Sequence, residues 1–188
     1  MDIETYMDNW ENNRFWEHLD FPHHKRRFKF LADNLEGQRF LDVGCAFGHS
    51  TYKLSRLRKG SWHGLDFSMR AVEKAAENFY GQGIKFYYTD SFDLLSCCGK
   101  FDSVVCSEVL DYVEEDWKLA LALMRVTKQV LLVTVRCRDK SDSGRLKVYT
   151  ADKLRALFKK FDCWIEREDP FFFAKVRHRL GEEFIFYD

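Results

Sequence analysis

The sequence predicts an α/β protein with a doubly wound, mainly parallel sheet covered by helices on both faces. Short apolar segments alternate with segments of helical periodicity from residue 39 to residue 161. The region after residue 162 is strand-rich and leaves no room for another crossover helix. The chain has 188 residues, of which 46% are apolar, so we expect one domain with a full core over residues 1–188.

The strands are predicted from short apolar runs that end in turn residues. The segment QVLLVTV is apolar on both faces, which is typical of a central strand in a covered parallel sheet. The region from Cys163 to Asp188, with a turn expected at Gly181, should supply antiparallel neighbours. The parallel strands are expected at residues 39–43, 61–66, 84–89, 101–107 and 129–135.

The helices are predicted from apolar spacing and from their end signals. Pro22 opens the first and Gly60 ends the second, while Ser68 and Thr150 are suitable N-caps. The expected helices lie at about 22–36, 48–59, 69–79, 116–128 and 151–161. Residues 1–36 form an arm before the first strand, and its two helices are expected to pack over one edge of the sheet. Residues 38–188 form the core of the domain.

Composition narrows the classes of function. The 30 basic and 30 acidic residues leave no net charge, which disfavours a large nucleic-acid surface. The N-terminus lacks the features of a signal peptide, and no apolar run approaches the roughly 20 residues that span a bilayer. We therefore expect a cytoplasmic protein that does not bind a membrane. The six cysteines include no CxxC pair, so we expect reduced thiols, no disulfides and no metal site.

An acid follows each of the first three predicted strands, at an even spacing of 24 residues: Asp42, Asp66 and Asp90. Because parallel strands end at one edge of the sheet, the three carboxylates should lie along that edge. Asp66 is placed to accept hydrogen bonds from a ribose diol, and Asp90 from an adenine amine. A lone acid after a strand can instead cap the next helix, and this alternative stays open.

The turn after the first strand, in FLDVGCAFGHST, narrows the choice of ligand. No lysine follows Gly48, so the turn is not a triphosphate-binding loop. A dinucleotide site would need glycines where Ala46 and His49 stand. S-adenosylmethionine carries an adenosyl group and an amino acid but no phosphate, so acids near its ribose and ammonium are favourable. It suits this turn best.

At this point the sequence resembles the class I S-adenosylmethionine-dependent methyltransferases, most closely the small-molecule group of type 11 or type 12 domains. FLDVGCAFG resembles the first motif of the family, HGLDFSMRAVEKA the second and YYTDSFDL the third. FDSVVCSEVLDYVEE resembles the fourth, and GRLKVYTADKLRALF the segment after strand five. The match covers roughly residues 38–160 and is specific because the motifs occur in order.

The resemblance implies a Rossmann-like, seven-stranded sheet of order 3-2-1-4-5-7-6, with strand 7 antiparallel, in a three-layer sandwich. It implies that Asp42 lies near the methionine ammonium, Asp66 at the ribose hydroxyls and Asp90 at the adenine amine. Ser107 would border the transferred methyl group. The full set of implied cofactor-binding residues is Asp42, Gly44, Cys45, Ala46, Gly48, Asp66, Phe67, Asp90, Ser91 and Ser107.

The sequence departs from the family in two places. Ala46 replaces the commoner middle glycine of the turn, which is tolerated where φ is negative. Asp111 and Tyr112 stand where many relatives carry a glutamate–histidine pair. The motifs of adenine, glutamine and cytosine methylation are absent, which disfavours those substrates.

Several residues are candidates for catalysis or for covering the substrate. A general base is needed only if the acceptor holds its proton tightly; the candidates are Glu108, Asp111, Tyr112 and His49. For His49, packing in the first helical turn is the simpler interpretation. In the arm, Tyr6, Trp10 and Trp16 either pack on the sheet or form a lid over the substrate. The cluster HHKRR, residues 23–27, is interpreted as a solvated helix face, with binding of an anionic substrate as the alternative.

The sequence thus predicts a methyltransferase that uses S-adenosylmethionine, releases S-adenosylhomocysteine and acts on a small molecule, as a monomer or homodimer. One alternative is an RNA or protein methyltransferase, which a basic face combining residues 23–27 with Lys175, Arg177 and Arg179 would favour. Another is a non-catalytic cofactor-binding partner protein, which a plugged substrate pocket would favour.

Overall fold

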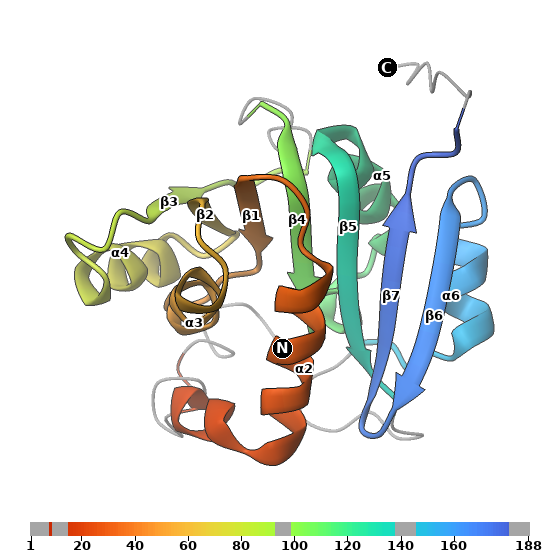
Figure 1. The fold of residues 1–188 in the computed structure, drawn as a ribbon, viewed down its shortest axis with the longest axis horizontal. Coiled ribbons are helices and arrows are strands. Elements are labelled where there is room, and N and C mark those ends of the chain that lie inside the picture. Colours follow the sequence, from red (N-terminus) through yellow and green to blue (C-terminus); the bar gives the residue numbers. More distant parts are fainter. Residues whose placement is uncertain (1–7, 9–14, 93–98, 138–145, 181–188) are drawn as a thin grey trace.

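The fold is a single mixed sheet of seven strands with helices on both faces (Figure 1). The computed structural model describes residues 8, 15–92, 99–137 and 146–180. The strand order is β3-β2-β1-β4-β5-β7-β6, and β7 runs antiparallel to both of its neighbours. This confirms the predicted order and the antiparallel seventh strand. The strands are β1 (Arg39–Val43), β2 (Ser61–Asp66), β3 (Lys85–Tyr88), β4 (Phe101–Ser107), β5 (Thr127–Arg136), β6 (Asp162–Glu168) and β7 (Phe171–Arg177).

The helices begin where the sequence provides a start signal. The side chain of Ser68 accepts a hydrogen bond from the Ala71 amide at 3.2 Å, and that of Thr150 accepts one from the Lys153 amide at 3.2 Å. Both predicted N-caps are therefore confirmed. The helical segments are η1 (Phe15–Asp20), α2 (Pro22–Asn34), α3 (His49–Leu57), α4 (Met69–Asn78), η3 (Leu110–Tyr112), α5 (Asp116–Val126) and α6 (Ala151–Leu157).

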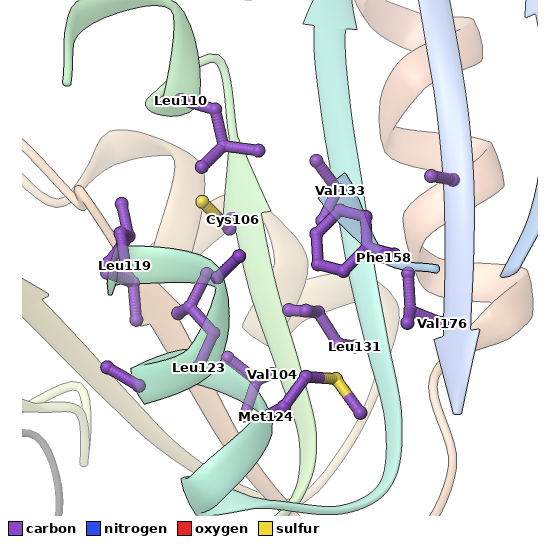
Figure 2. Close-up of a cluster of buried hydrophobic side chains, with 14 of the residues drawn as sticks. Val104, Cys106, Leu110, Leu119, Leu123, Met124, Leu131, Val133, Phe158 and Val176 are labelled. Atoms are coloured by element: carbon purple, nitrogen blue, oxygen red, sulfur yellow. The ribbon is translucent and has the colours of Figure 1, made fainter. Parts of the chain in front are cut away.

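Two apolar cores hold the three layers together. On one face of the sheet, α5 and α6 cover β4, β5 and β7 with side chains such as Leu123 and Phe158 (Figure 2). On the other face, Phe28 and Leu31 of α2 pack with Leu132 of β5. In Figure 1, α2 and α3 lie in front of the sheet, and α5 and α6 lie behind it.

The N-terminal arm covers a face of the sheet, so the expected packing over an edge is wrong. The apolar side of α2 lies against the central strands β4 and β5, whose outward residues Val105, Val130 and Leu132 belong to the same buried cluster. The edges of the sheet are formed by β3 and β6. A helix with two buried apolar residues, Phe28 and Leu31, gains more by covering central strands than by lining an edge.

The C-terminal strands β6 and β7 are antiparallel neighbours, as expected, and they form a hairpin. β6 ends at Glu168 and β7 begins at Phe171, so Asp169 and Pro170 make the turn. An acid followed by proline is a recognised turn signal. The turn predicted at Gly181 lies outside the described residues.

Cys45, Cys106, Cys137 and Cys163 are free thiols; Cys97 and Cys98 lie outside the described residues. None of the helices in the described ranges is long and apolar enough to cross a membrane.

Replacing Leu123 should measure how much the α5 core contributes to stability. Leu123 is fully buried, so Leu123→Ala should lower the free energy of unfolding by about 2–5 kcal/mol through lost burial and a residual cavity. The matched control is Leu57→Ala on α3, whose side chain is 55% exposed and which should change stability by less than about 0.5 kcal/mol. Urea denaturation of both variants is the measurement. Equal losses would contradict the assigned core.

Candidate functional site

The carboxyl ends of the parallel strands form one edge of the sheet, which we call the rim. β1 ends beside Asp42, β2 at Asp66 and β4 at Ser107, and all three strands run in the same direction. Asp90 follows the end of β3 by two residues. In Figure 1, η1 and the N-terminal half of α2 lie beyond the carboxyl ends of β1 and β4. The rim therefore gathers the predicted acids and also receives part of the arm.

The turn after β1 is built from left-handed residues. Gly44 has φ +77° and Gly48 has φ +82°, a region that L side chains rarely occupy. The amides of Gly44 and Cys45 both donate to the carbonyl of Leu65, at 2.8 and 3.0 Å, which ties the turn to the end of β2. Ala46 also has a positive φ, +46°, so the expectation of a negative φ at this alanine is wrong.

Asp66 fixes the turn from the end of β2. Its Oδ2 accepts a hydrogen bond from the Ala46 amide at 2.8 Å, and its Oδ1 accepts one from the Ser68 amide at 3.0 Å. The side chain is nearly buried, and burial raises the pKa of the carboxyl. The Phe67 amide also hydrogen-bonds to this carboxyl, and since a carboxylate has about four acceptor positions, about one stays available for a further donor. The hydrogen bond from the Ala46 amide to Asp66 helps to stabilise this alanine in its left-handed conformation.

Asp42 lies near the end of β1 and is hydrogen-bonded to the first turn of α3. It is 2% exposed, and its Oδ2 accepts a hydrogen bond from the Thr51 hydroxyl at 2.6 Å. Burial raises the pKa of Asp42 to about 6, although Thr51 and Arg27 act in the opposite direction. The sequence reasoning did not single out Thr51; its position nine residues after the acid, in the first turn of the following helix, was the available signal.

The rim beyond β2 and β3 carries two aromatic rings and an exposed acid. Phe67 meets Phe92 edge to face, with ring centroids 5.4 Å apart. Asp90 is exposed, and the amide of Ser91 donates to Thr89 Oγ1 at 3.3 Å. Phe92 was missed by the sequence reasoning, although an aromatic residue two positions after Asp90 is visible in YYTDSFDL. An aromatic pair beside an acceptor suits a flat heterocycle with an exocyclic amine.

The end of β4 carries an ion cluster that the sequence reasoning missed. Glu108, directly after β4, has φ +59° and pairs with Arg27 of α2 and with Nε of Arg136 of β5 at 2.8 Å. Burial opposes ionisation of Glu108, yet the two guanidinium groups lower its pKa to about 2. His24 and Arg27 are buried, so the interpretation of residues 23–27 as a solvated face is wrong for these two. No spacing in the sequence reveals that this helix turns a charged residue toward β4.

Asp111 and Tyr112 lie in η3, near the same arginine. The buried Asp111 accepts a hydrogen bond from the Arg136 amide at 3.4 Å, and its carbonyl accepts from the amides of Leu146 and Lys147. Tyr112 and Asp111 both favour the charged form of Arg136. Ser107 Oγ lies 2.7 Å from Thr134 Oγ1, in the pairing of β4 with β5.

The remaining predicted site residues lie outside the groups described above. His49 opens α3, its ring lies 5.2 Å from that of Phe79, and burial lowers its pKa. The side chain of Cys45 is buried, and burial raises the pKa of its thiol. Tyr6 and Trp10 lie outside the described residues, and Trp16 lies in η1. Among the residues described, no cluster of three or more potential metal ligands is present.

The fold and the rim define a class of protein: a Rossmann-like domain with the strand order and turn of the class I methyltransferases. A family model described as a methyltransferase domain matches residues 34–169, which is most of the chain. The chain therefore belongs to this family and is an S-adenosylmethionine-dependent methyltransferase, which confirms the resemblance found in the sequence. Comparison with curated proteins gave no match.

Solved structures of methyltransferases share the fold at low sequence identity. Magnesium protoporphyrin IX methyltransferase from Synechocystis PCC 6803 with bound SAM is 18% identical, with a TM-score of 0.68, covering 94% of this chain and 98% of that one. The DhpI–SAH complex is 16% identical, with a TM-score of 0.72 and coverage of 93% and 94%. A methyltransferase in complex with the Trm112 activator from Haloferax volcanii is 13% identical, with a TM-score of 0.73 and coverage of 92% and 98%.

An added methyl group at Gly44 should test how closely the segment after β4 covers the turn. A Cβ at Gly44 would lie 2.2 Å from Val109 Cγ2, whereas one at Gly81, which has a similar φ of +75°, meets nothing. Gly81→Ala should therefore cost only the left-handed strain, about 1 kcal/mol, and Gly44→Ala distinctly more. Thermal unfolding of both variants measures this.

A double-mutant cycle then isolates the contact. The loss from Gly44→Ala should shrink in a Val109→Ala background, where the clashing methyl groups are gone. Equal losses at Gly44 and Gly81, or a loss at Gly44 that is independent of Val109, would contradict the close approach.

The charge of the buried Asp42 should lower the stability of the fold at neutral pH, and this contribution should disappear at acid pH. Its folded pKa of about 6 lies above the ordinary 3.8, so the charged form is disfavoured in the fold, and this cost grows as pH rises from about 4 to about 6. Asp42→Asn keeps an acceptor for Thr51 and removes the charge. It should raise the free energy of unfolding at pH 7 by up to about 3 kcal/mol, a gain that shrinks as the pH is lowered to 4.

Chemical denaturation across this pH range is the measurement. The control is Asp152→Asn, whose side chain is 93% exposed and whose effect should stay small at every pH. An Asp42→Asn variant that is less stable at pH 7, or that shows no pH dependence, would contradict burial as the dominant influence on Asp42.

Proposed function

We propose that this enzyme transfers a methyl group from S-adenosylmethionine to a small-molecule acceptor bound at the rim. The observation that carries the proposal is the placement of the arm: α2 reaches over the end of β4, and Arg27 pairs with Glu108 there. Because the N-terminal arm covers part of the rim, a small acceptor would fit there better than an extended polymer. Magnesium protoporphyrin IX methyltransferase, a neighbour of the same fold, is named for a small-molecule acceptor.

The residues at the rim fit S-adenosylmethionine. Beyond its three backbone hydrogen bonds, Asp66 keeps about one acceptor position, which a ribose hydroxyl would fill. The backbone from Gly44 to Gly48 would hold the methionine part, with Asp42 beneath it. Asp90 would accept from the adenine amine, while Phe67 and Phe92 supply apolar contact. The turn contains no lysine that would bind a phosphate group.

The protein's task in this reaction is positioning. S-adenosylmethionine supplies a methyl group already activated on a sulfonium, so orientation and exclusion of water are what the chain adds. Ser107, at the end of β4, and the residues after it would border the acceptor. The Val109 side chain lies directly over Gly44, and it would shift outward to admit the methionine part.

Glu108 is best assigned to positioning rather than to proton transfer. A carboxylate with a pKa of about 2 that is held by two arginines is a weak base at neutral pH. Its charge instead fixes the guanidinium groups of Arg27 and Arg136 at the end of β4. Where the acceptor needs a base, Asp111, Tyr112 and His49 stay candidates, and His49 is neutral at pH 7 because burial lowers its pKa.

The structure offers little support for RNA or protein as the substrate. The basic face that would favour such a polymer is compensated by nearby acids. Lys175 lies 3.7 Å from Glu36, Arg177 also pairs with Glu36, and Arg179 lies 3.8 Å from Asp162. A polyanion would have to displace these acids to bind there.

We extend the proposal to the arm, which together with the core would form one methyltransferase domain and would act as a lid. η1 is tied to α3 by Lys53, whose Nζ donates to the Leu19 carbonyl at 3.1 Å and to Asp20 at 2.5 Å. This anchor holds η1 beyond the rim, where Trp16 lies on the chain leading into α2.

Replacement of Asp66 tests the cofactor site. Asp66→Asn removes the charge and one acceptor oxygen, so binding of S-adenosylhomocysteine should weaken about 10- to 100-fold, as expected for lost charge-assisted hydrogen bonds. Isothermal titration calorimetry measures this, and the exposed Asp152→Asn is the control that should bind like the wild type. Wild-type affinity in the Asp66→Asn variant would overturn the assigned ribose contact.

A further inference from the structure

The ion cluster after β4 has more hydrogen-bond donors than acceptors. We define the arginine cluster as Arg27, Glu108 and Arg136, together with His23 and His24 beside them. Arg27 is 4% exposed, yet within the described residues its one hydrogen bond goes to Glu108. Its Nε is buried and has no hydrogen-bond partner among the residues described, although a guanidinium carries five donors.

Aromatic rings take the place of the missing acceptors around both arginines. The guanidinium of Arg27 lies 5.6 Å from the ring centre of Phe171, and that of Arg136 lies 5.5 Å from the same ring. Such contacts stabilise a cation but accept none of its in-plane N–H groups. In the described part of the chain, the side chain of Arg136 has one hydrogen bond, from Nε to Glu108. Its terminal nitrogens therefore still have donors to offer.

The cluster is short of direct acceptors. Two guanidinium groups pair with one carboxylate, and the lowered pKa of Glu108 keeps that carboxylate ionised at all physiological pH values. Asp111 and Asp42 favour the charged forms of Arg136 and Arg27, but neither carboxylate accepts a hydrogen bond from these guanidinium groups among the described residues. His24 adds no charge, because burial lowers its pKa to about 3, and its buried Nδ1 has no hydrogen-bond partner within the described ranges. A bound anion would supply the missing acceptors.

The cluster lies where a methyl acceptor would bind and is open to solvent on one side. Arg27 acts electrostatically on Asp42 at the end of β1, and Glu108 directly follows the strand that borders the transfer site. Arg27 closes the inner side, whereas the Arg136 side chain is 21% exposed and His23 is half-buried. An acceptor could therefore reach Arg136 from solvent, with its other end directed toward β1.

Resting on the methyltransferase function proposed for this rim, we propose that the acceptor carries a carboxylate that binds to Arg136 and Arg27. The planar guanidinium fork matches a carboxylate in two parallel hydrogen bonds. A carboxylate places one negative charge beside Glu108, whereas a phosphate dianion would place two there. At His24 and Arg27, a role in binding an anion thus replaces the interpretation of residues 23–27 as a solvated helix face.

The test uses benzoate as a probe, with benzamide as its neutral analogue and inorganic phosphate as the competing anion. Each is titrated into the wild-type protein, with and without S-adenosylhomocysteine, while the Nε–Hε signals of the arginines are followed by NMR. We expect benzoate to shift the Arg136 signal and to bind at least about tenfold more tightly than benzamide or phosphate. Equal binding of benzoate and benzamide, or tighter binding of phosphate, would overturn the carboxylate assignment.

Three variants separate this role from a structural one. Arg136→Gln should weaken benzoate binding about tenfold and leave binding of S-adenosylhomocysteine unchanged. Glu108→Gln, with folding checked by circular dichroism, should tighten benzoate binding, because it frees both guanidinium groups. The control Arg26→Gln removes an equal charge from the exposed side of α2, where Arg26 pairs with Glu168, and should bind like the wild type. Equal losses for Arg136→Gln and Arg26→Gln, or weaker binding in a folded Glu108→Gln, would overturn the proposal.

A transfer assay links the cluster to the acceptor and keeps the two proposals distinguishable. Metabolite extracts are separated on an anion-exchange column, and each fraction is incubated with methyl-labelled S-adenosylmethionine and the enzyme. Acceptors in the retained, anionic fractions support the carboxylate proposal, and acceptors only in the unretained fraction overturn it. Failure of S-adenosylhomocysteine to bind would instead remove the proposed cofactor site, while the benzoate titration without it still tests the cluster.

Discussion

The ion pairs of Glu108 are the interaction on which the arrangement of the rim depends. This one carboxylate connects three elements that are far apart in the sequence: Arg27 on α2, Arg136 at the end of β5, and the segment that follows β4. Glu108 itself holds a φ of +59°, a conformation that costs of order 1 kcal/mol or more in a residue with a side chain. The two buried pairs offset that strain. Each pair joins Glu108 to a different element, so the arm and the sheet are coupled through this point.

The acids of the rim show a related conflict between stability and function. Asp42 and Asp66 are almost fully buried, and burial raises the pKa of both. A fold optimised for stability alone would place neutral side chains there. Their hydrogen bonds to Thr51, Ala46 and Ser68 reduce this cost without removing it. A ligand with a cationic amine and a ribose diol would reduce this cost further by binding to the two carboxylates. Such a ligand agrees with the family to which the chain belongs.

Much of the fold could be predicted because strand–helix alternation and end signals are local properties. The N-caps Ser68 and Thr150 and the strands that end near Asp42 and Asp66 follow from short-range patterns, whereas the strand order was implied by the resemblance to the family. Features set by tertiary contacts could not be predicted. The positive φ of Ala46 depends on an acceptor twenty residues away, and the inward direction of Arg27 depends on Glu108, eighty-one residues away. The helical periodicity of α2 identifies its apolar side. It does not identify which polar residue beside that apolar side faces a partner on another element.

The same contrast explains why the substrate side of the site is harder to infer than the cofactor side. Contacts to the cofactor come from strand ends and one turn, which every member of the fold must keep in place. Contacts to the acceptor come from the arm and from the segments after β4 and β5, where side chains differ without disturbing the sheet. In this chain those segments bring two arginines and one glutamate together, whereas the strand ends on the cofactor side carry the acids Asp42, Asp66 and Asp90. A cationic sulfonium would then lie between acids on one side, with the anion held by the arginines on the other. The attraction between that anion and the sulfonium would draw the two reactants together before transfer. This attraction is a physical reason for placing acids at one end of the rim and arginines at the other.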